Sequence, residues 1–156
     1  MKKKVHLFLL VILTLALYSC KEQEATKTYR EADVIGTWEL TSARLYDREA
    51  KFLTETTPKD EFGCGNLTWI FTTDQIELVT YIGKDENDQC LEEVIQLSYT
   101  LQDHTIHTVD DTGVKEEMLI THLTEDEFTF MTSLPNPLNK EDNAIKYTEI
   151  RCKRVK

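Results

Sequence analysis

The chain has 156 residues, which is enough for one domain of ordinary size. Its 28 acidic residues exceed its 18 lysines and arginines, so the formal net charge is −10 at pH 7. A protein this acidic is repelled by nucleic acids and by anionic lipid surfaces, so we expect no nucleic-acid partner.

The first nineteen residues have the pattern of an export signal. A basic start with three lysines precedes an apolar run over residues 5–18, which is too short to cross a bilayer as a helix because that takes about 20 residues. The sequence Leu17-Tyr18-Ser19-Cys20 resembles a bacterial lipobox. The resemblance implies that residues 1–19 are a lipoprotein signal peptide and that Cys20 is lipidated and becomes the N-terminus. The alternative is an ordinary cleaved signal beside a chance cysteine.

Residues 20–33 have the composition of a flexible tether, although residues 29–34 can form a helical turn. Cleavage before Cys20 removes three lysines and no acids, which brings the net charge to −13, so membrane attachment must come from the acyl chains. The cluster Lys21-Glu22-Gln23-Glu24 resembles the signal that sends some Bacteroidetes lipoproteins to the outer face of the outer membrane. It implies a lipid-anchored outer-membrane protein, with surface exposure favoured over a periplasm-facing location. A plain solvated tether is the alternative.

Residues 34–156 have the pattern of an all-β domain, because short runs rich in Thr, Val, Ile, Tyr and Phe are separated by Asp, Asn and Gly clusters. We predict eight strands, at residues 36–46, 66–73, 75–82, 91–101, 104–109, 114–122, 127–134 and 144–155. Most connections are hairpin-sized, which favours an antiparallel meander. Eight such strands can close into an up-and-down barrel that leaves no free edge. A two-sheet β-sandwich is the alternative.

In an up-and-down order, every second connection lies at the same end. The connections 47–65, 83–90, 110–113 and 135–143 therefore share one end, and only short turns remain at the other. Long connections at one end predict an open end that faces a ligand.

The start of the first strand carries a family resemblance. Gly36-Thr37-Trp38, with a turn before it and a long loop after the strand, resembles the lipocalin pattern, and residues 34–155 are similar to the lipocalin-like domain of Bacteroidetes lipoproteins. Lipocalins place an arginine over this tryptophan at the closed end. The resemblance therefore implies that Gly36 and Trp38 close the barrel with Arg151 or Arg154 of the last strand, by a cation–π contact. We expect Arg151.

Three cysteines remain besides Cys20, an odd number for a protein exported to an oxidising compartment. Cys64 enters the second predicted strand and Cys90 follows the third, so both lie at the same end of an antiparallel meander, whereas Cys152 lies near the other end. We predict a Cys64–Cys90 disulfide, with Cys152 a reduced core residue on the same face as Ile150. The alternative is that no disulfide forms.

No motif predicts catalysis, a metal or a cofactor. Asp111-Thr112-Gly113 matches the aspartic-protease triplet, but only one copy is present and a hairpin turn explains it. Residues 85–88 lack the glycine and distal glutamate of a calcium-binding EF-hand loop. His104 and His107 are three residues apart, so on a strand they face opposite sides and cannot share a metal.

We therefore predict a non-enzymatic protein that binds a small apolar or neutral ligand at the open end, where acidic side chains disfavour anions. The residues predicted to line a cavity are Trp69, Phe71, Tyr99, Met118, Ile120, Phe128 and Phe130, although the same side chains could simply fill the barrel. The alternative function is a surface interaction module with a filled barrel, which contacts a protein or glycan through its long loops.

Overall fold

A computed structural model describes residues 28–133 and 146–156. The predicted signal peptide, Cys20 and the 135–143 connection lie outside these residues. The described part contains one short helix, α2 (Glu31–Val34), and nine strands: β1 (Gly36–Tyr46), β2 (Phe52–Thr56), β3 (Thr68–Phe71), β4 (Gln75–Lys84), β5 (Cys90–Gln102), β6 (Thr105–Val109), β7 (Lys115–Leu123), β8 (Glu127–Thr132) and β9 (Tyr147–Arg154). No helix in these residues is long and apolar enough to cross a membrane.

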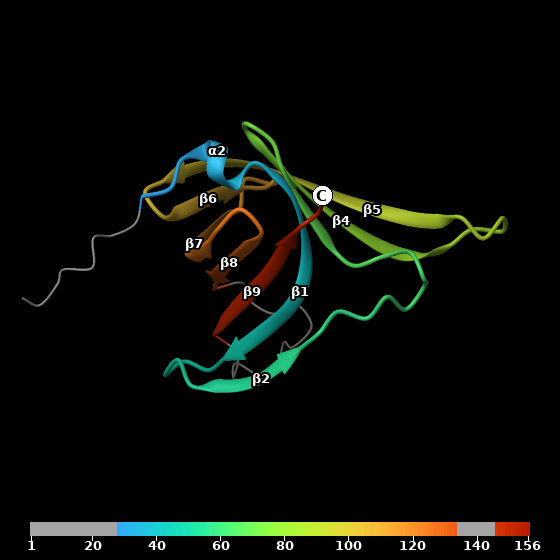
Figure 1. The fold of residues 1–156 in the computed structure, drawn as a ribbon, viewed down its shortest axis with the longest axis horizontal. Helices are drawn as coiled ribbons and strands as arrows, with labels where there is room; N and C mark the ends of the chain where they lie inside the picture. Colours follow the sequence, from blue (N-terminus) through green and yellow to red (C-terminus); the bar gives the residue numbers. More distant parts are fainter. Residues whose placement is uncertain (1–27, 134–145) are drawn as a thin grey trace, which may run out of the picture.

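All nine strands belong to one antiparallel sheet, which closes because β1 pairs with β9 (Figure 1). β1 also pairs with β3, and each strand from β3 to β8 pairs with the next along the chain. These eight strands form a closed up-and-down barrel, so the predicted fold is confirmed and the two-sheet sandwich is excluded.

The extra strand, β2, was not predicted, because it lies inside the segment 47–65 that we expected to be a loop. It pairs only with the last residues of β1, where Ala43 faces Thr56 and Tyr46 faces Phe52. All five of its residues are exposed, so it shows no alternation of buried and exposed positions.

Aromatic side chains fill the barrel interior. Trp38, Phe128 and Phe130 are all 0% exposed. The ring of Phe128 lies 5.3 Å from that of Trp38 and 5.0 Å from that of Phe130, and the Trp69 ring lies 5.4 Å from Phe130. Because each ring removes a large apolar area from water, this cluster is a main source of the barrel's stability.

The segment before β1 covers one end of the barrel. The indole Nε1 of Trp38 donates to the carbonyl oxygen of Val34 at 2.8 Å, and the backbone N–H of Tyr29 donates to the carbonyl oxygen of Asp103 at 2.9 Å. α2 is the helical turn that the sequence predicted within residues 29–34. The last residues of the predicted tether therefore belong to the domain and form its closed end.

The arginine over Trp38 is Arg154, so the prediction of Arg151 was wrong. Cζ of Arg154 lies 4.0 Å from the centroid of the Trp38 ring, and its Nη1 donates to the carbonyl oxygen of Ile35 at 2.9 Å. The β1–β9 register places Arg154 opposite Trp38. Side chains alternate along a strand, so Arg154 shares the inner face with the buried Cys152, whereas Arg151 points outward.

Gly36 allows this approach of the arginine. Its φ of +140° is rarely adopted by residues with a side chain, and a Cβ atom at this position would collide with Nη1 of Arg154. The predicted role of Gly36 in closing the barrel therefore has a direct steric reason.

Three hairpin turns at the opposite, open end share one geometry. Each begins with an aspartate whose carboxylate accepts the backbone N–H groups two and four residues later, at 2.8–3.0 Å: Asp47, Asp85 and Asp110. The fourth residue of each turn has a positive φ: Ala50 (59°), Asp88 (63°) and Gly113 (85°). The triplet Asp111-Thr112-Gly113 is part of a hairpin turn, as predicted.

β4 and β5 extend past the strands that flank them. β3 pairs with β4 only up to Val79, and β6 pairs with β5 only from Ser98 onward. Residues 80–97 therefore lack a neighbouring strand on one edge and project as a hairpin, which we call the arm and which reaches to the right in Figure 1. The predicted Cys64–Cys90 disulfide is present, with the Cα atoms 5.8 Å apart, and it joins the arm to the segment before β3.

Candidate binding site at the open end

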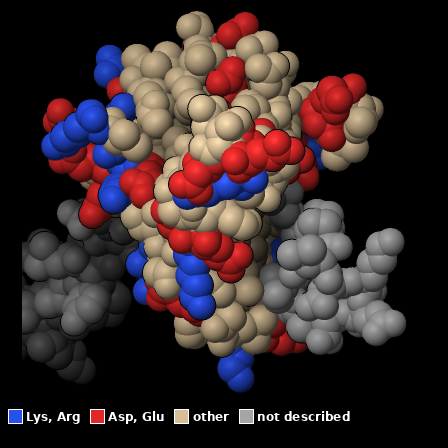
Figure 2. Space-filling view, turned by 90° about the vertical axis from the view of Figure 1, so that its right-hand side faces the viewer, with Lys and Arg blue, Asp and Glu red and all other residues tan. Residues whose placement is uncertain are grey.

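An apolar stripe runs along the inner face of the arm, from the barrel core to solvent. Across β4 and β5, Ile76 faces Leu97 and Leu78 faces Ile95. Ile76 is 0% exposed, Leu78 and Leu97 are partly buried against the core, and Ile95 is 45% exposed. Leu91, four residues further out on the same face of β5, is 44% exposed, and the pair of Glu93 and Thr80 separates it from Ile95. Exposed apolar surface that continues a core is typical of an interaction site. Figure 2 views the molecule from the side to which the arm points and shows acidic side chains across this face, with some basic side chains among them.

Beside the β6–β7 turn, a hollow of about 850 Å³ is lined from both faces of the barrel wall, and its outward-facing residues include His107, Lys115 and Glu117. Tyr99, Thr108 and Glu116 line it and form one rung, because Tyr99 pairs with Thr108 and Thr108 pairs with Glu116. Thr132 of β8 also lines this hollow. Tyr99, Thr108 and Thr132 are almost fully buried, so this part of the wall belongs to the barrel interior.

Two polar groups of this hollow have no partner. Thr132 Oγ1 is buried and makes no hydrogen bond with any residue that the structure describes. Burial and the nearby charge of Asp110 raise the pKa of Glu116, whose carboxylate has no ion-pair partner in residues 28–133 and 146–156. In contrast, Thr108 Oγ1 donates to the backbone oxygen of Glu116 at 3.4 Å, and the hydroxyl of Tyr99 donates to a carbonyl oxygen at 2.7 Å. Unpartnered polar groups in an apolar wall are what a ligand can satisfy.

The seven residues predicted to line a cavity are all at most 6% exposed and belong to one core cluster: Trp69, Phe71, Tyr99, Met118, Ile120, Phe128 and Phe130. Their inward orientation is therefore confirmed. Tyr99 also lines the hollow, whereas the other six belong to the packed core rather than to the hollow's wall. Sequence reasoning missed Glu116 and Thr132. They are recognised as inward-facing only from their pairing with the buried residues Thr108 and Met118.

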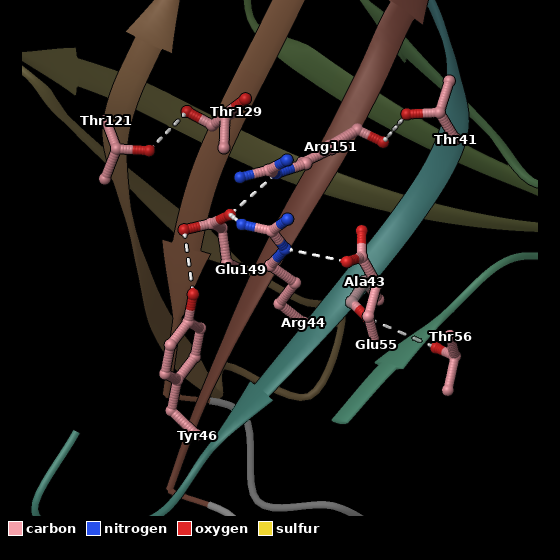
Figure 3. A network of polar contacts seen from close by, with 10 residues as sticks. All are labelled: Thr41, Ala43, Arg44, Tyr46, Glu55, Thr56, Thr121, Thr129, Glu149 and Arg151. Atoms are coloured by element: carbon pink, nitrogen blue, oxygen red, sulfur yellow. Dashed lines mark hydrogen bonds and ion pairs between the residues drawn. The ribbon is translucent and has the colours of Figure 1, made fainter. Parts of the chain in front are cut away.

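Arg151 belongs to a polar network on the outer wall, across β1, β2 and β9 (Figure 3). The side chain of Glu149 is 15% exposed and accepts hydrogen bonds from Arg151 Nε at 2.8 Å and from the hydroxyl of Tyr46 at 3.4 Å. Arg44 lies 4.0 Å from Glu149 and donates to Glu55 of β2 at 3.0 Å. Acids and arginines alternate in this network, so it ties β2 to the barrel wall. Ion pairs this exposed stabilise a protein by about 0–1 kcal/mol each.

Groups that could carry other chemistry are separated. Residues 28–133 and 146–156 contain no group of three or more His, Cys, Asp or Glu side chains that could hold a metal ion. His107 Nδ1 lies 3.4 Å from Glu117, whereas Nδ1 of His104 is buried without a hydrogen bond to the described residues. Cys152 is a free and buried cysteine, as predicted, and burial raises the pKa of its thiol to about 12. At neutral pH its reactive thiolate form is therefore scarce.

The sequence model of a lipocalin-like domain matches residues 34–130. The chain belongs to this lipocalin-like domain family. The match begins at Val34, two residues before Gly36, and runs through the strands that carry the core aromatic residues. The predicted resemblance is therefore confirmed. No curated protein matches the chain.

Three solved structures are similar to this one. A lipocalin-like protein from Bacteroides uniformis has a TM-score of 0.50 and 12% sequence identity, over 79% of this chain and 99% of that chain. An uncharacterized protein from Bacteroides eggerthii has a TM-score of 0.47 and 13% identity, over 79% and 100%. A de novo designed fluorescence-activating β-barrel has a TM-score of 0.34 and 13% identity, over 80% and 96%. At such low identity, the likeness to the B. uniformis protein shows the fold alone.

Proposed function

We propose that this lipocalin-like domain is a non-enzymatic binding module that holds a small apolar or neutral molecule at its open end. One observation carries the proposal: the apolar stripe begins in the core and reaches Ile95, which is 45% exposed, and Leu91, which is 44% exposed, lies beyond Glu93 on the same face. A soluble domain gains stability by covering such a surface, and a bound apolar molecule can supply that cover.

The gain from this stripe alone is modest. Burying a whole Leu or Ile side chain stabilises by about 1.5–3 kcal/mol, so covering the exposed halves of Leu91 and Ile95 contributes on the order of 2 kcal/mol. A dissociation constant of 1 μM corresponds to about 8 kcal/mol. Micromolar binding therefore needs further contacts, and the adjoining hollow with its unpartnered Glu116 and Thr132 supplies polar ones.

We also propose that the domain is anchored to the outer membrane by acyl chains on Cys20, on the cell surface. The lipobox-like residues 17–20 and the Lys-Glu-Gln-Glu cluster after them support this. The contact between Tyr29 and Asp103 lies at the closed end, so the first described residues lie at that end. An anchor there leaves the open end facing away from the membrane. Mass spectrometry of the mature N-terminus and protease treatment of intact cells test these two points.

Two variants of neighbouring residues test the binding site. Val94 and Ile95 are 46% and 45% exposed, but they lie on opposite faces of β5. We expect Ile95→Asn to weaken binding of the neutral apolar dye Nile red by about tenfold, which corresponds to about 1.4 kcal/mol, and Val94→Asn to leave it unchanged. Equal binding by wild type and Ile95→Asn would contradict the proposed site.

A second candidate function is an interaction module, which the packed interior and the open edge of the arm favour. Residues Cys90 to Leu97 of β5 do not pair with β6, so one edge of the arm is unpaired. An unpaired edge can accept another strand. In that case Val94→Asn and Ile95→Asn should weaken contact with the partner alike, because both side chains flank the paired backbone. Crosslinking on intact cells with a photoreactive group at Gln96 measures this.

A further inference from the structure

We infer that the molecule bound at the open end carries a protonated amine, which Glu116 and Thr132 bind together. This inference rests on the proposed binding function and adds the chemical class of the ligand's polar group. It follows from the position of one carboxylate and one hydroxyl in the barrel wall.

Glu116 occupies an inward position of β7. The residues on the same face of this strand, Met118 and Ile120, are only 1% and 4% exposed. Across the ladder, Glu116 faces Thr108, which is 2% exposed. A carboxylate in such a face loses part of its hydration and stabilises the fold only if an opposite charge or hydrogen-bond donors replace the water.

No ion pair among the described residues supplies that opposite charge, because Lys115 and His107, which also line the hollow, lie on the opposite face of the strands from Glu116. Glu116 has no ion pair there, and the nearby charge that acts on it is the like charge of Asp110. Both this repulsion and burial raise the pKa of Glu116, as expected for a carboxylate that lacks its counter-ion. The next residue, Glu117, differs in both respects, because its side chain is 73% exposed and lies 3.4 Å from His107.

Thr132 adds a second unsatisfied group beside Glu116. It is 3% exposed, its Oγ1 has no hydrogen-bond partner within the described residues, and it lines the same hollow. Thr132 pairs with Met118, two residues from Glu116 on the same face, so the two side chains are diagonal neighbours across β7 and β8. Diagonal pairs of this kind lie about 7–8 Å apart, within the span of one bridging group.

An ammonium group fits this pair better than other polar groups do. It carries three N–H donors and one positive charge, so one N–H can reach the carboxylate and another the threonine oxygen. A neutral hydroxyl would satisfy Thr132 but leave the charge of Glu116 uncompensated. A carboxylate or phosphate would place another negative charge beside Glu116 and Asp110. The apolar body of the ligand would then lie along Tyr99 and the stripe on the arm.

Three ten-carbon probes that differ only in the head group test the inference: decylamine, decan-1-ol and decanoate, each displacing Nile red from the full chain at pH 7. Decylamine should bind about tenfold or more tightly than decan-1-ol, because a charge-assisted hydrogen bond replaces a neutral one, and decanoate should bind most weakly. Glu116→Gln should remove the preference for the amine and leave decan-1-ol binding unchanged. Glu127→Gln, which removes the same charge from a side chain that is 70% exposed, lies 3.5 Å from His122 and is outside the hollow, should keep the preference.

Thr132→Val provides a second variant of nearly unchanged shape, and it should reduce the amine preference about threefold or more. Equal binding of decylamine and decan-1-ol by the wild type would overturn the inference, as would equal losses in Glu116→Gln and Glu127→Gln. If decan-1-ol binds in an Ile95-dependent manner without an amine preference, the proposed function stands and only this inference fails. If neither Nile red nor any of the three probes binds, the proposed function fails with it.

Discussion

Removal of the Thr132 hydroxyl should stabilise the protein. Thr132 is 3% exposed and its Oγ1 has no partner in the described residues, so folding takes a hydroxyl out of water without replacing its hydrogen bonds. An uncompensated buried group of this kind costs about 1–3 kcal/mol. Valine has nearly the same shape and replaces the hydroxyl with a methyl group. We therefore expect Thr132→Val to raise the free energy of unfolding by about 1–2 kcal/mol.

Thr108→Val is the matched control. Thr108 is equally buried on the neighbouring rung, but its Oγ1 donates to the backbone oxygen of Glu116 at 3.4 Å. The same change should therefore lower the free energy of unfolding by about 0.5–1 kcal/mol, because it removes a hydrogen bond that the protein makes. The two variants should differ by about 2 kcal/mol, with opposite signs relative to wild type.

Equilibrium urea unfolding, followed by tryptophan emission and far-UV circular dichroism, measures both variants with the disulfide intact. The slopes should stay unchanged, since neither variant alters the surface exposed on unfolding. If Thr132→Val lowers stability as much as Thr108→Val does, the hydroxyl of Thr132 has a partner. The argument for an unsatisfied polar site at the open end would then lose its main support.

Three further predictions concern the closed end and the turns. Gly36→Ala should lower the free energy of unfolding in urea by about 2 kcal/mol or more, because the new Cβ displaces the arginine over Trp38. A Cβ at Gly63 would meet nothing within 4 Å, so Gly63→Ala should cost only the backbone strain of about 1 kcal/mol. Equal losses in the two variants would rule out the steric explanation. Ala50→Gly should stabilise the protein by about 0.5–1 kcal/mol and raise its thermal midpoint, because Ala50 has a φ of 59° and Gly113 occupies the equivalent position of the β6–β7 turn. A lower thermal midpoint would contradict this. The N–H of Gln89 lowers the pKa of Asp85, and the hydroxyl of Thr112 and the N–H of Val114 lower that of Asp110. Since the folded pKa values lie below the unfolded ones, these carboxylates stabilise the protein above about pH 4, and the stabilisation is lost as the pH falls through the lowered values. The double variant Asp85→Asn/Asp110→Asn should therefore lose less stability than wild type as the pH falls below about 4.

Much of the fold could be predicted from local patterns, because strands and turns are encoded by neighbouring residues. Short runs rich in Thr, Val, Ile, Tyr and Phe indicated the eight barrel strands, and Asp, Asn and Gly clusters indicated the turns between them. Chain order alone then placed Cys64 and Cys90 at one end, where the disulfide joins them. The family pattern at Gly36 and Trp38 indicated a closed end, which the structure confirms.

The arginine over Trp38 could also have been predicted from the sequence, because side chains alternate along the last strand. Cys152 was predicted to face the core, and Arg154 is two residues further along the same strand, so alternation alone would have selected Arg154. Arg151, at an odd spacing from Cys152, had to face outward, where it pairs with Glu149. The two-residue alternation of side chains was therefore enough to identify Arg154 from the sequence.

The tertiary structure alone decided the remaining features. β2 exists because β1 continues past β3 and offers an unpaired edge, which no local pattern within the five exposed residues of β2 indicates. The sequence Lys115-Glu116-Glu117 does not distinguish two adjacent glutamates. Pairing with buried Thr108 turns Glu116 inward, while Glu117 faces solvent beside His107. The proposed binding site therefore depends on the register between strands, which long-range pairing sets and sequence composition does not.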